Sequence, residues 1–303
     1  MLHSVVGRLK SHCTNLPLQI YTFARWKRPL CTVAVEKSNK EVYLEQLNGE
    51  YKGIVVVNLN RPSKKNALGK VLLSDLNDAI SQLEYSSPKA VQVALVRSCV
   101  DNVFCAGADL KERAQMSDEE TLPFVRYLRS TFTRLEAVPM PTIAVVDGFA
   151  LGGGTELALA CDLRVAGKQA VLGLPETTLA ILPGAGGTQR LPRLVGIGKA
   201  KELVYTGARL NAEEARKIGL VERIAQGEET AFSCALSLAK DMLKTGPVAL
   251  RLAKQAIRNG SQVDILRGLE FEDASYARVI PTKDRREALS AFAEKRKPQF
   301  RGE

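Results

Sequence analysis

The sequence is poor in histidine: its 303 residues contain only His3 and His12. Both lie in the N-terminal 35 residues, so the rest of the chain has no imidazole. This excludes Ser-His-Asp and Cys-His catalytic groups from that part, together with most zinc sites. Cysteine is also sparse, with six residues and no C-x-x-C spacing. We expect buried, reduced thiols and no disulfide framework.

Several other features are missing from the sequence. No run approaches the roughly 18 uninterrupted apolar residues that a membrane span requires. Neither a G-x-x-x-x-G-K-[ST] phosphate loop nor a G-x-G-x-x-G motif after the first strand occurs, which disfavours nucleotide-binding folds of those kinds. The hydrophobic fraction of 45% and the charged fraction of 25% are typical of a globular protein.

The formal charge of +10 is concentrated at the two ends of the chain. Residues 1–35 carry five basic and no acidic side chains, with apolar and hydroxylated residues between them. This composition is typical of a mitochondrial transit peptide, and we expect a matrix protein; a disordered or membrane-touching arm is the alternative. Residues 283–303 contribute a further +3, so the basic balance does not indicate a nucleic-acid-binding face.

Hydrophobic periodicity predicts strands alternating with helices in the first two thirds of the chain, followed by helices alone. The expected strands are 41–47, 53–59, 91–97, 142–146, 163–166 and 171–173. The expected helices are 68–83, 117–137, 156–161, 198–206, 211–217, 229–244, 246–258, 264–277 and 283–294. Ser117 and Glu120 form a capping box that opens the second of them. Turns or loops are expected at 61–66, 104–109, 148–154 and 184–187. We predict an α/β core at 36–230 and a helical C-terminal region at 231–303, after the transit peptide at 1–35.

A run of three glycines, Gly152 to Gly154, stands at a predicted strand-to-helix turn. Glycine allows the backbone to approach a ligand closely, and N–H groups at a helix start attract negative charge. The Ala108 amide, at another strand end, could supply a second donor. Two convergent donors are what an enolate oxygen requires. The alternative is that the glycines only allow tight packing of helix on sheet.

Two carboxylates, Glu156 and Glu176, stand in apolar surroundings. Burial raises the pKa of a carboxyl group toward the range that is useful for proton transfer. Two such groups suit a reaction that takes a proton from water and places one on carbon. The alternative is that backbone amides or an arginine satisfy both.

Three segments, 104–113, 150–158 and 173–191, together resemble the enoyl-CoA hydratase/isomerase (crotonase) family. The resemblance covers about 42–302 and implies a spiral of ββα units, with a helical C-terminal region that forms a homotrimer or a dimer of trimers. It also implies acyl-CoA thioester substrates and no metal or redox cofactor, because the thioester itself stabilises the carbanion.

The resemblance also implies roles for individual residues. Ala108 and Gly153 would donate the oxyanion-hole amides, Glu156 would activate water as general base, and Glu176 would protonate C2. The implied substrate-binding residues are Lys65, Ala67, Ala106, Asp109, Leu110, Gly152, Pro175, Gly184 and Lys295. Thr155 stands where the family resemblance implies an apolar residue or a cysteine.

The expected activity is hydration of a 2-enoyl-CoA to a 3-hydroxyacyl-CoA, in fatty-acid or branched-chain amino-acid breakdown. The motifs are most similar to a mitochondrial branch that includes methylglutaconyl-CoA hydratases, so that leucine-degradation step is one alternative. An isomerase or hydrolase is another. A third is an RNA-binding protein on the same fold, which the acidic residues of the 68–83 helix disfavour.

Overall fold

The computed structural model describes residues 40–303 of the chain. The predictions for the transit peptide at 1–35, and for His3, His12 and the first two cysteines, lie outside the described residues.

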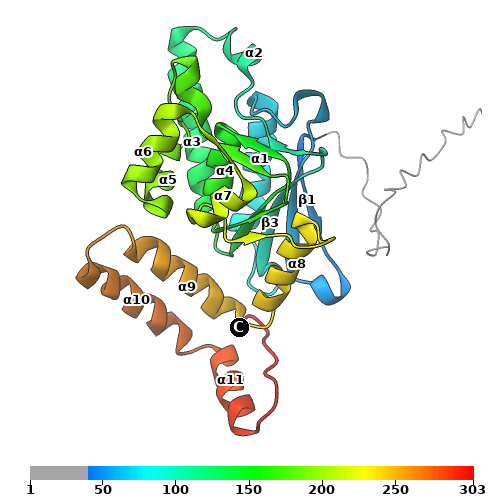
Figure 1. The fold of residues 1–303 in the computed structure, drawn as a ribbon. Helices are drawn as coiled ribbons and strands as arrows, with labels where there is room; N and C mark the ends of the chain where they lie inside the picture. Colours follow the sequence, from blue (N-terminus) through cyan, green and yellow to red (C-terminus); the bar gives the residue numbers. More distant parts are fainter. Residues whose placement is uncertain (1–39) are drawn as a thin grey trace, which may run out of the picture. The chain divides into compact units, whose positions relative to one another are not determined.

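Ten strands in the described part form two sheets (Figure 1). The six-stranded sheet has the order β1-β2-β3-β5-β7-β10 and is parallel except for β1. The four-stranded sheet has the order β4-β6-β8-β9 and is parallel except for β9. Their bounds are β1 Val42–Gln46, β2 Ile54–Leu59, β3 Val93–Ser98, β4 Val103–Cys105, β5 Thr142–Val146, β6 Phe149–Leu151, β7 Leu163–Ala166, β8 Val171–Gly173, β9 Arg209–Asn211 and β10 Arg223–Ile224.

Successive strands alternate between the two sheets, which produces the spiral of ββα units expected from the family resemblance. The pairs β3/β4, β5/β6 and β7/β8 each place their first strand in the large sheet and their second in the small one. Because β4, β6 and β8 are parallel neighbours, their carboxyl ends meet at one edge of the small sheet.

Helices surround the sheets and fill the C-terminal quarter of the chain (Figure 1). They are α1 Lys70–Glu84, α2 Leu110–Arg113, α3 Asp118–Ala137, α4 Gly153–Leu159, α5 Gly187–Val195, α6 Ile197–Thr206, α7 Ala212–Lys217, α8 Ala231–Met242, α9 Pro247–Gly260, α10 Ile265–Val279 and α11 Lys283–Ala293, with short 3-10 turns η1 Gly49–Tyr51, η2 Pro62–Lys64 and η3 Pro175–Leu179. The predicted capping box at Ser117 and Glu120 is present at the start of α3.

The core lies on both faces of the large sheet. Strand β2 is buried at every position, with Val55 and Val57 in the cluster beneath α1 and α3 and Ile54 and Val56 in a second cluster. Helix α8 supplies Ala235 and its apolar neighbours to that second cluster. Burial on both faces explains why β2 reads as an unbroken valine-rich run. The domain boundary at 230/231 remains a prediction, although α8 packs on the sheet.

Helix α9 is attached to this core by two cations. The Arg251 guanidinium donates to the carbonyls of Ser86 and Val91 at 2.8 and 2.9 Å. The buried Lys254 ammonium lies 2.7 Å from Asp162 and also donates to the Met140 carbonyl. These bonds fix the start of the C-terminal helices to the loops between the strands.

Several local predictions were wrong. The expected loop at 104–109 begins with strand β4, and the turn at 148–154 contains strand β6. Helix α4 begins at Gly153, three residues before its predicted start. The last third contains two short strands, β9 and β10, besides helices. The glycines that follow β4 and flank β6 indicated loops and turns at these short strands.

The 184–187 segment and one cysteine also differ from expectation. Gly187 begins a helix, α5, that includes Pro192; proline and glycine hid this helix in the sequence. Cys105, Cys161 and Cys234 are buried as expected, whereas Cys99 is exposed just beyond the end of β3. No disulfide joins these four described cysteines.

The side chain of Thr155 joins β6 to β8. Its buried hydroxyl lies 2.6 Å from the Ala150 carbonyl and 2.9 Å from the Gly173 carbonyl, and it accepts the Gly173 N–H at 3.1 Å. An apolar residue at this position could make none of these bonds. The hydroxyl therefore holds together the two strand ends that precede Gly152 and Glu176.

Replacing Thr155 by valine should lower the free energy of unfolding by about 1–3 kcal/mol, because buried backbone groups lose their partner while the shape is kept. Urea unfolding measures the change. Thr206→Val is the matched control: its exposed hydroxyl donates to the Glu202 carbonyl, and the variant should stay within about 0.5 kcal/mol. Equal stability of the two variants would contradict the bridging role.

Candidate active site

The carboxyl ends of β4, β6 and β8 bring three predicted segments together. Ala106 to Asp109 follow β4, Gly152 and Gly153 follow β6, and Glu176 follows β8. The turn before α1 joins them, because Leu68 accepts from the Asp109 N–H and donates to the Gly107 carbonyl. Residues as far apart in the chain as Leu68 and Glu176, 108 positions, thus share one site.

The backbone amides of Ala108 and Gly153 lie close together. A Cβ atom built on Gly153 would lie 3.8 Å from the Ala108 nitrogen. Among the hydrogen bonds within residues 40–303, neither N–H has an acceptor. Gly107 has φ +93°, and a Cβ atom there would lie 2.7 Å from the Leu151 carbonyl oxygen. Only glycine allows this approach of the two segments, which leaves two neighbouring donors available to an oxyanion.

Gly152 brings the backbone equally close to Glu176. Its φ is +53°, and a Cβ atom there would lie 2.9 Å from Oε1 of Glu176. The Gly152 N–H donates to the Gly173 carbonyl at 2.9 Å, which fixes the turn against β8. A side chain at position 152 would displace the carboxylate.

Glu156 points from the first turn of α4 into the interior and is 2% exposed. Its Oε1 accepts the N–H groups of Ala185 and Gly187 at 2.8 and 2.7 Å. Burial raises its pKa, while these two N–H groups and the positive charges of Arg190 and Arg129 oppose the rise. The alternative expected from the sequence, satisfaction by backbone amides, therefore holds for one oxygen of this carboxylate.

Glu176 lies in η3, half-buried, and its Oε2 has no hydrogen-bond partner. Burial, and next the negative charge of Glu156, raise its pKa to about 7. When Glu156 is ionised, its negative charge disfavours the ionisation of Glu176. The site thus holds one carboxylate with fixed partners beside one carboxyl group that exchanges its proton near neutral pH.

The other predicted residues from the first 200 positions surround this centre. The Lys65 carbonyl accepts the Ala106 N–H at 3.1 Å, and Lys65 itself has φ +52° in the expected turn. The Ala67 carbonyl accepts from Arg61 at 2.7 Å. Leu110 is exposed at the start of α2, and Pro175 opens η3.

Asp109 has its side chain occupied by the protein. Its carboxylate caps α2 through the Glu112 N–H and lies 3.0 Å from Nη1 of Arg61. Burial opposes ionisation, but the Glu112 amide and Arg61 outweigh it, and the pKa of Asp109 is lowered. Its backbone is bonded as well, because the N–H donates to the Leu68 carbonyl and the carbonyl accepts the Arg113 N–H, so Asp109 supports the loop around Ala108.

Lys295 is the one predicted residue that is not brought to this centre by any contact within the described chain. It is exposed, with φ +54°, directly after α11. In Figure 1, α2 lies at the top of the picture, whereas α11 lies at the bottom, below α9 and α10. A contact with the substrate through a neighbouring subunit remains a prediction.

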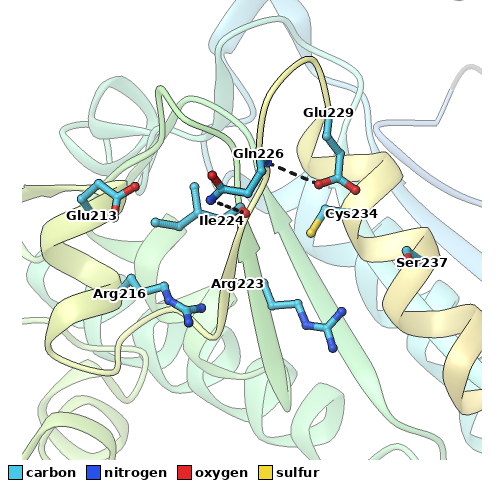
Figure 2. Close-up of a pocket in the computed structure, with 8 residues that line it drawn as sticks. All are labelled: Glu213, Arg216, Arg223, Ile224, Gln226, Glu229, Cys234 and Ser237. Carbon is cyan, nitrogen blue, oxygen red and sulfur yellow. Dashed lines mark hydrogen bonds between the residues drawn. The ribbon is translucent and has the colours of Figure 1, made fainter.

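Other features of residues 40–303 do not compete with this site. They contain no group of three or more His, Cys, Asp or Glu that could hold a metal ion. A cavity of about 380 Å³ lies between α7, β10 and α8 (Figure 2). Neither Glu156 nor Glu176 lines it, and the charged side chains in its walls are those of Arg216, Arg223, Glu213 and Glu229.

A family model described as Enoyl-CoA hydratase/isomerase matches residues 49–303. The chain belongs to the enoyl-CoA hydratase/isomerase family. The resemblance found in the three sequence motifs is therefore confirmed, and so is the fold class.

Relatives in this family are similar over most of their length. Enoyl-CoA hydratase domain-containing protein 2, mitochondrial, of Mus musculus is 52% identical over 90% of this chain and 92% of its own. Methylglutaconyl-CoA hydratase, mitochondrial, of Homo sapiens is 49% identical over 88% of this chain and 79% of its own. The crystal structure of enoyl-CoA hydratase from Bacillus anthracis has a TM-score of 0.83 and 46% identity, covering 87% of this chain and 100% of that one.

Sequence reading missed the charged residues that hold the family's site in this chain. Arg61 joins Glu41, Ala67 and Asp109, and Arg190 joins Glu136 and Ala185. Arg190 stands inside the third motif, but its partner is on α3, more than 50 positions away. No local pattern in the sequence indicates such pairs.

The raised pKa of Glu176 makes the stability of the protein depend on pH. Below about pH 4.5 the carboxyl group of Glu176 is protonated in both the folded and the unfolded chain. Between pH 4.5 and about 7 the unfolded chain loses this proton while the folded chain keeps it. The free energy of unfolding therefore falls as the pH rises through this range. Glu176→Gln removes this term. Its stability relative to the parent should increase from pH 4.5 to 7 and then stay constant, as measured by urea unfolding. A pH-independent difference would show that the pKa of Glu176 is ordinary.

Proposed function

We propose that the protein is an enoyl-CoA hydratase that adds water to a 2-enoyl-CoA and gives a 3-hydroxyacyl-CoA. One observation carries the proposal: two unpartnered backbone N–H groups, at Ala108 and Gly153, lie next to two glutamates of different environment. The first pair suits a thioester oxygen that becomes an enolate, and the second pair suits two proton transfers.

In the proposed reaction the ionised Glu156 takes a proton from water, and the hydroxide oxygen forms a bond to C3. The C2=C3 electron pair moves onto the thioester oxygen, where the Ala108 and Gly153 N–H groups stabilise the negative charge. Glu176 then gives its proton to C2, which restores the thioester. Proton exchange with solvent reprotonates Glu176 and deprotonates Glu156. A pKa of Glu176 near 7 matches donation at neutral pH.

The acyl group is the open part of this proposal. Relatives named enoyl-CoA hydratase domain-containing protein 2 and relatives named methylglutaconyl-CoA hydratase match at nearly equal identity. We therefore propose unbranched 2-enoyl-CoA as the first substrate and a branched, acidic enoyl-CoA as the second. A panel of both distinguishes them by kcat/KM.

RNA binding is the weaker alternative. The exposed surface of α1 offers one basic residue, Lys70, and it also presents Asp78, while Asp75 accepts the Glu41 N–H. Such a surface does not attract phosphates. This supports a role in catalysis over a role in RNA binding.

The proposed location is the mitochondrial matrix. Its support is the acid-free, basic composition of residues 1–35 and the word mitochondrial in the names of the mouse and human relatives. In residues 40–303, no helix has the length and apolar character needed to cross a membrane.

We propose that the C-terminal helices form a homotrimer or a dimer of trimers. Their support is a set of exposed apolar side chains that one chain leaves uncovered: Ile257, Ile265, Leu266, Tyr276, Leu289 and Phe292. Phe292 is 85% exposed, which is unfavourable for a phenylalanine in water.

Light scattering should give the mass of three or six chains of 33.0 kDa, each shorter by any processed N-terminus. Phe292→Asp combined with Leu289→Asp should lower that mass, because charges would enter an apolar interface. Tyr85→Asp, on an equally exposed residue at the end of α1, should leave it unchanged. A monomeric parent at micromolar concentration would rule out the trimer.

Protein from residue 36 onward should hydrate crotonyl-CoA, as measured by loss of the enoyl-thioester absorbance. Glu156→Gln and Glu176→Gln should each lower kcat by about 10²–10⁴-fold, because each removes a proton-transfer group. Glu119→Gln, on an exposed residue in the first turn of α3, is the control and should keep full activity. Activity that survives both glutamate substitutions would refute the assigned roles.

A further inference from the structure

The turn from Gly184 to Gly187 lies between the Glu156 carboxylate and the Arg190 guanidinium. On one side, the N–H groups of Ala185 and Gly187 donate to Glu156, as described above. On the other, Nη1 of Arg190 donates to the Ala185 carbonyl at 2.9 Å. Ala185 thus receives a bond from Arg190 at its carbonyl and gives one to Glu156 at its nitrogen.

Two glycines make room for these side chains. A Cβ atom on Gly186, whose φ is +112°, would lie 2.2 Å from Nη1 of Arg190. A Cβ atom on Gly187 would lie 3.0 Å from Oε1 of Glu156. Both charged groups therefore contact the turn directly, one on each side.

Arg190 is itself fixed by a residue on another helix. Its Nε and Nη2 donate to Oε2 of Glu136 on α3, at 3.1 and 2.7 Å. The Arg190 side chain is 14% exposed and that of Glu136 is 32% exposed, so the guanidinium is largely shielded from water while its partner is partly solvated. Arg129, about two turns before Glu136 on α3, donates from Nε to the Gly184 carbonyl at 2.9 Å. Two cations thus hold two successive carbonyls of the turn.

We propose that Arg190 is a positioning residue that acts through the 184–187 turn to hold the Glu156 carboxylate as the ionised base; the inference rests on the proposed hydratase function. Arg190 contacts neither the reacting atoms nor Glu156. It fixes the Ala185 carbonyl, in the peptide unit between those that carry the two N–H groups Glu156 accepts, and its charge favours the ionised carboxylate.

The charges that act on Glu156 come from three elements of the described chain. Arg190 on α5 and Arg129 on α3 are positive and favour its ionisation. Glu176 in η3 is the negative neighbour when it is ionised. Glu136 lies behind Arg190, where it neutralises part of the guanidinium charge and fixes its direction.

Arg190→Gln tests both parts of the role. It should lower kcat for crotonyl-CoA by about 10- to 100-fold, with KM changed by less than about twofold, because the base is misplaced while the substrate contacts remain. The acidic limb of the pH profile of kcat/KM should move to higher pH, since Glu156 loses a stabilising positive charge.

Arg190→Lys separates charge from geometry. An ammonium group keeps the charge but cannot bond both Glu136 and the Ala185 carbonyl in a fixed fork. Its acidic limb should therefore stay close to that of the parent, while kcat remains lowered.

Arg134→Gln is the matched control. Arg134 lies on α3, as does Glu136, the partner of Arg190. It pairs with Glu84 of α1 at 2.7 Å and donates to Asn77 and Ser81. The variant loses a comparable ion pair with no link to the 184–187 turn. It should keep the kcat and pH profile of the parent even where its unfolding temperature falls.

The outcomes separate this inference from the proposed function. An active parent whose Arg190→Gln variant behaves like Arg134→Gln would overturn the positioning role and leave the hydratase intact. An inactive parent would overturn the hydratase. The positioning role would then be decided by ¹³C-carboxyl NMR titration of Glu156, where a higher pKa in Arg190→Gln than in the parent supports it and an equal pKa overturns it.

Discussion

The site depends on one buried carboxylate, Glu156, that must remain charged inside the protein. A carboxylate in apolar surroundings is unstable unless hydrogen bonds and opposite charges compensate for the lost water. Here the N–H groups of Ala185 and Gly187 supply the bonds, and Arg190 and Arg129 supply the charge. Burial of Glu176 itself, and next the negative charge of Glu156, raise the pKa of Glu176 to about 7, so the chemistry of the second carboxyl group depends in part on the charge of the first.

Close packing of backbone segments is the second requirement. The parallel pairing of β4, β6 and β8 sets three chain ends side by side, and glycines at 107 and 152 let these ends approach within contact distance. The Thr155 hydroxyl fixes β6 to β8 from within. The same spiral that builds the sheets therefore places a pair of free amides beside a pair of glutamates.

Much of this arrangement could be predicted from the sequence, and the reasons for success and failure are physical. Strand 142–146 was predicted at its observed bounds because its run of apolar residues is buried on both faces. Glu156 and Glu176 were conspicuous because charges are rare in apolar runs. Strands β4 and β6 were missed because the glycines beside them, Gly107, Gly148 and Gly152, indicated loops and turns, whereas the equally short β8 was predicted at its bounds. Arg61 and Arg190 were missed because their partners come from distant segments, and only the folded chain brings them together.

The most direct test of the account is a ¹³C-carboxyl NMR titration of the protein labelled at glutamate. The account predicts one carboxyl signal that titrates near pH 7, is absent in Glu176→Gln and moves to lower pH in Glu156→Gln, because the neighbouring charge has been removed. A spectrum in which no glutamate titrates near 7, or in which the signal stays in place when Glu156 is neutralised, would contradict the coupling on which the proposed reaction rests.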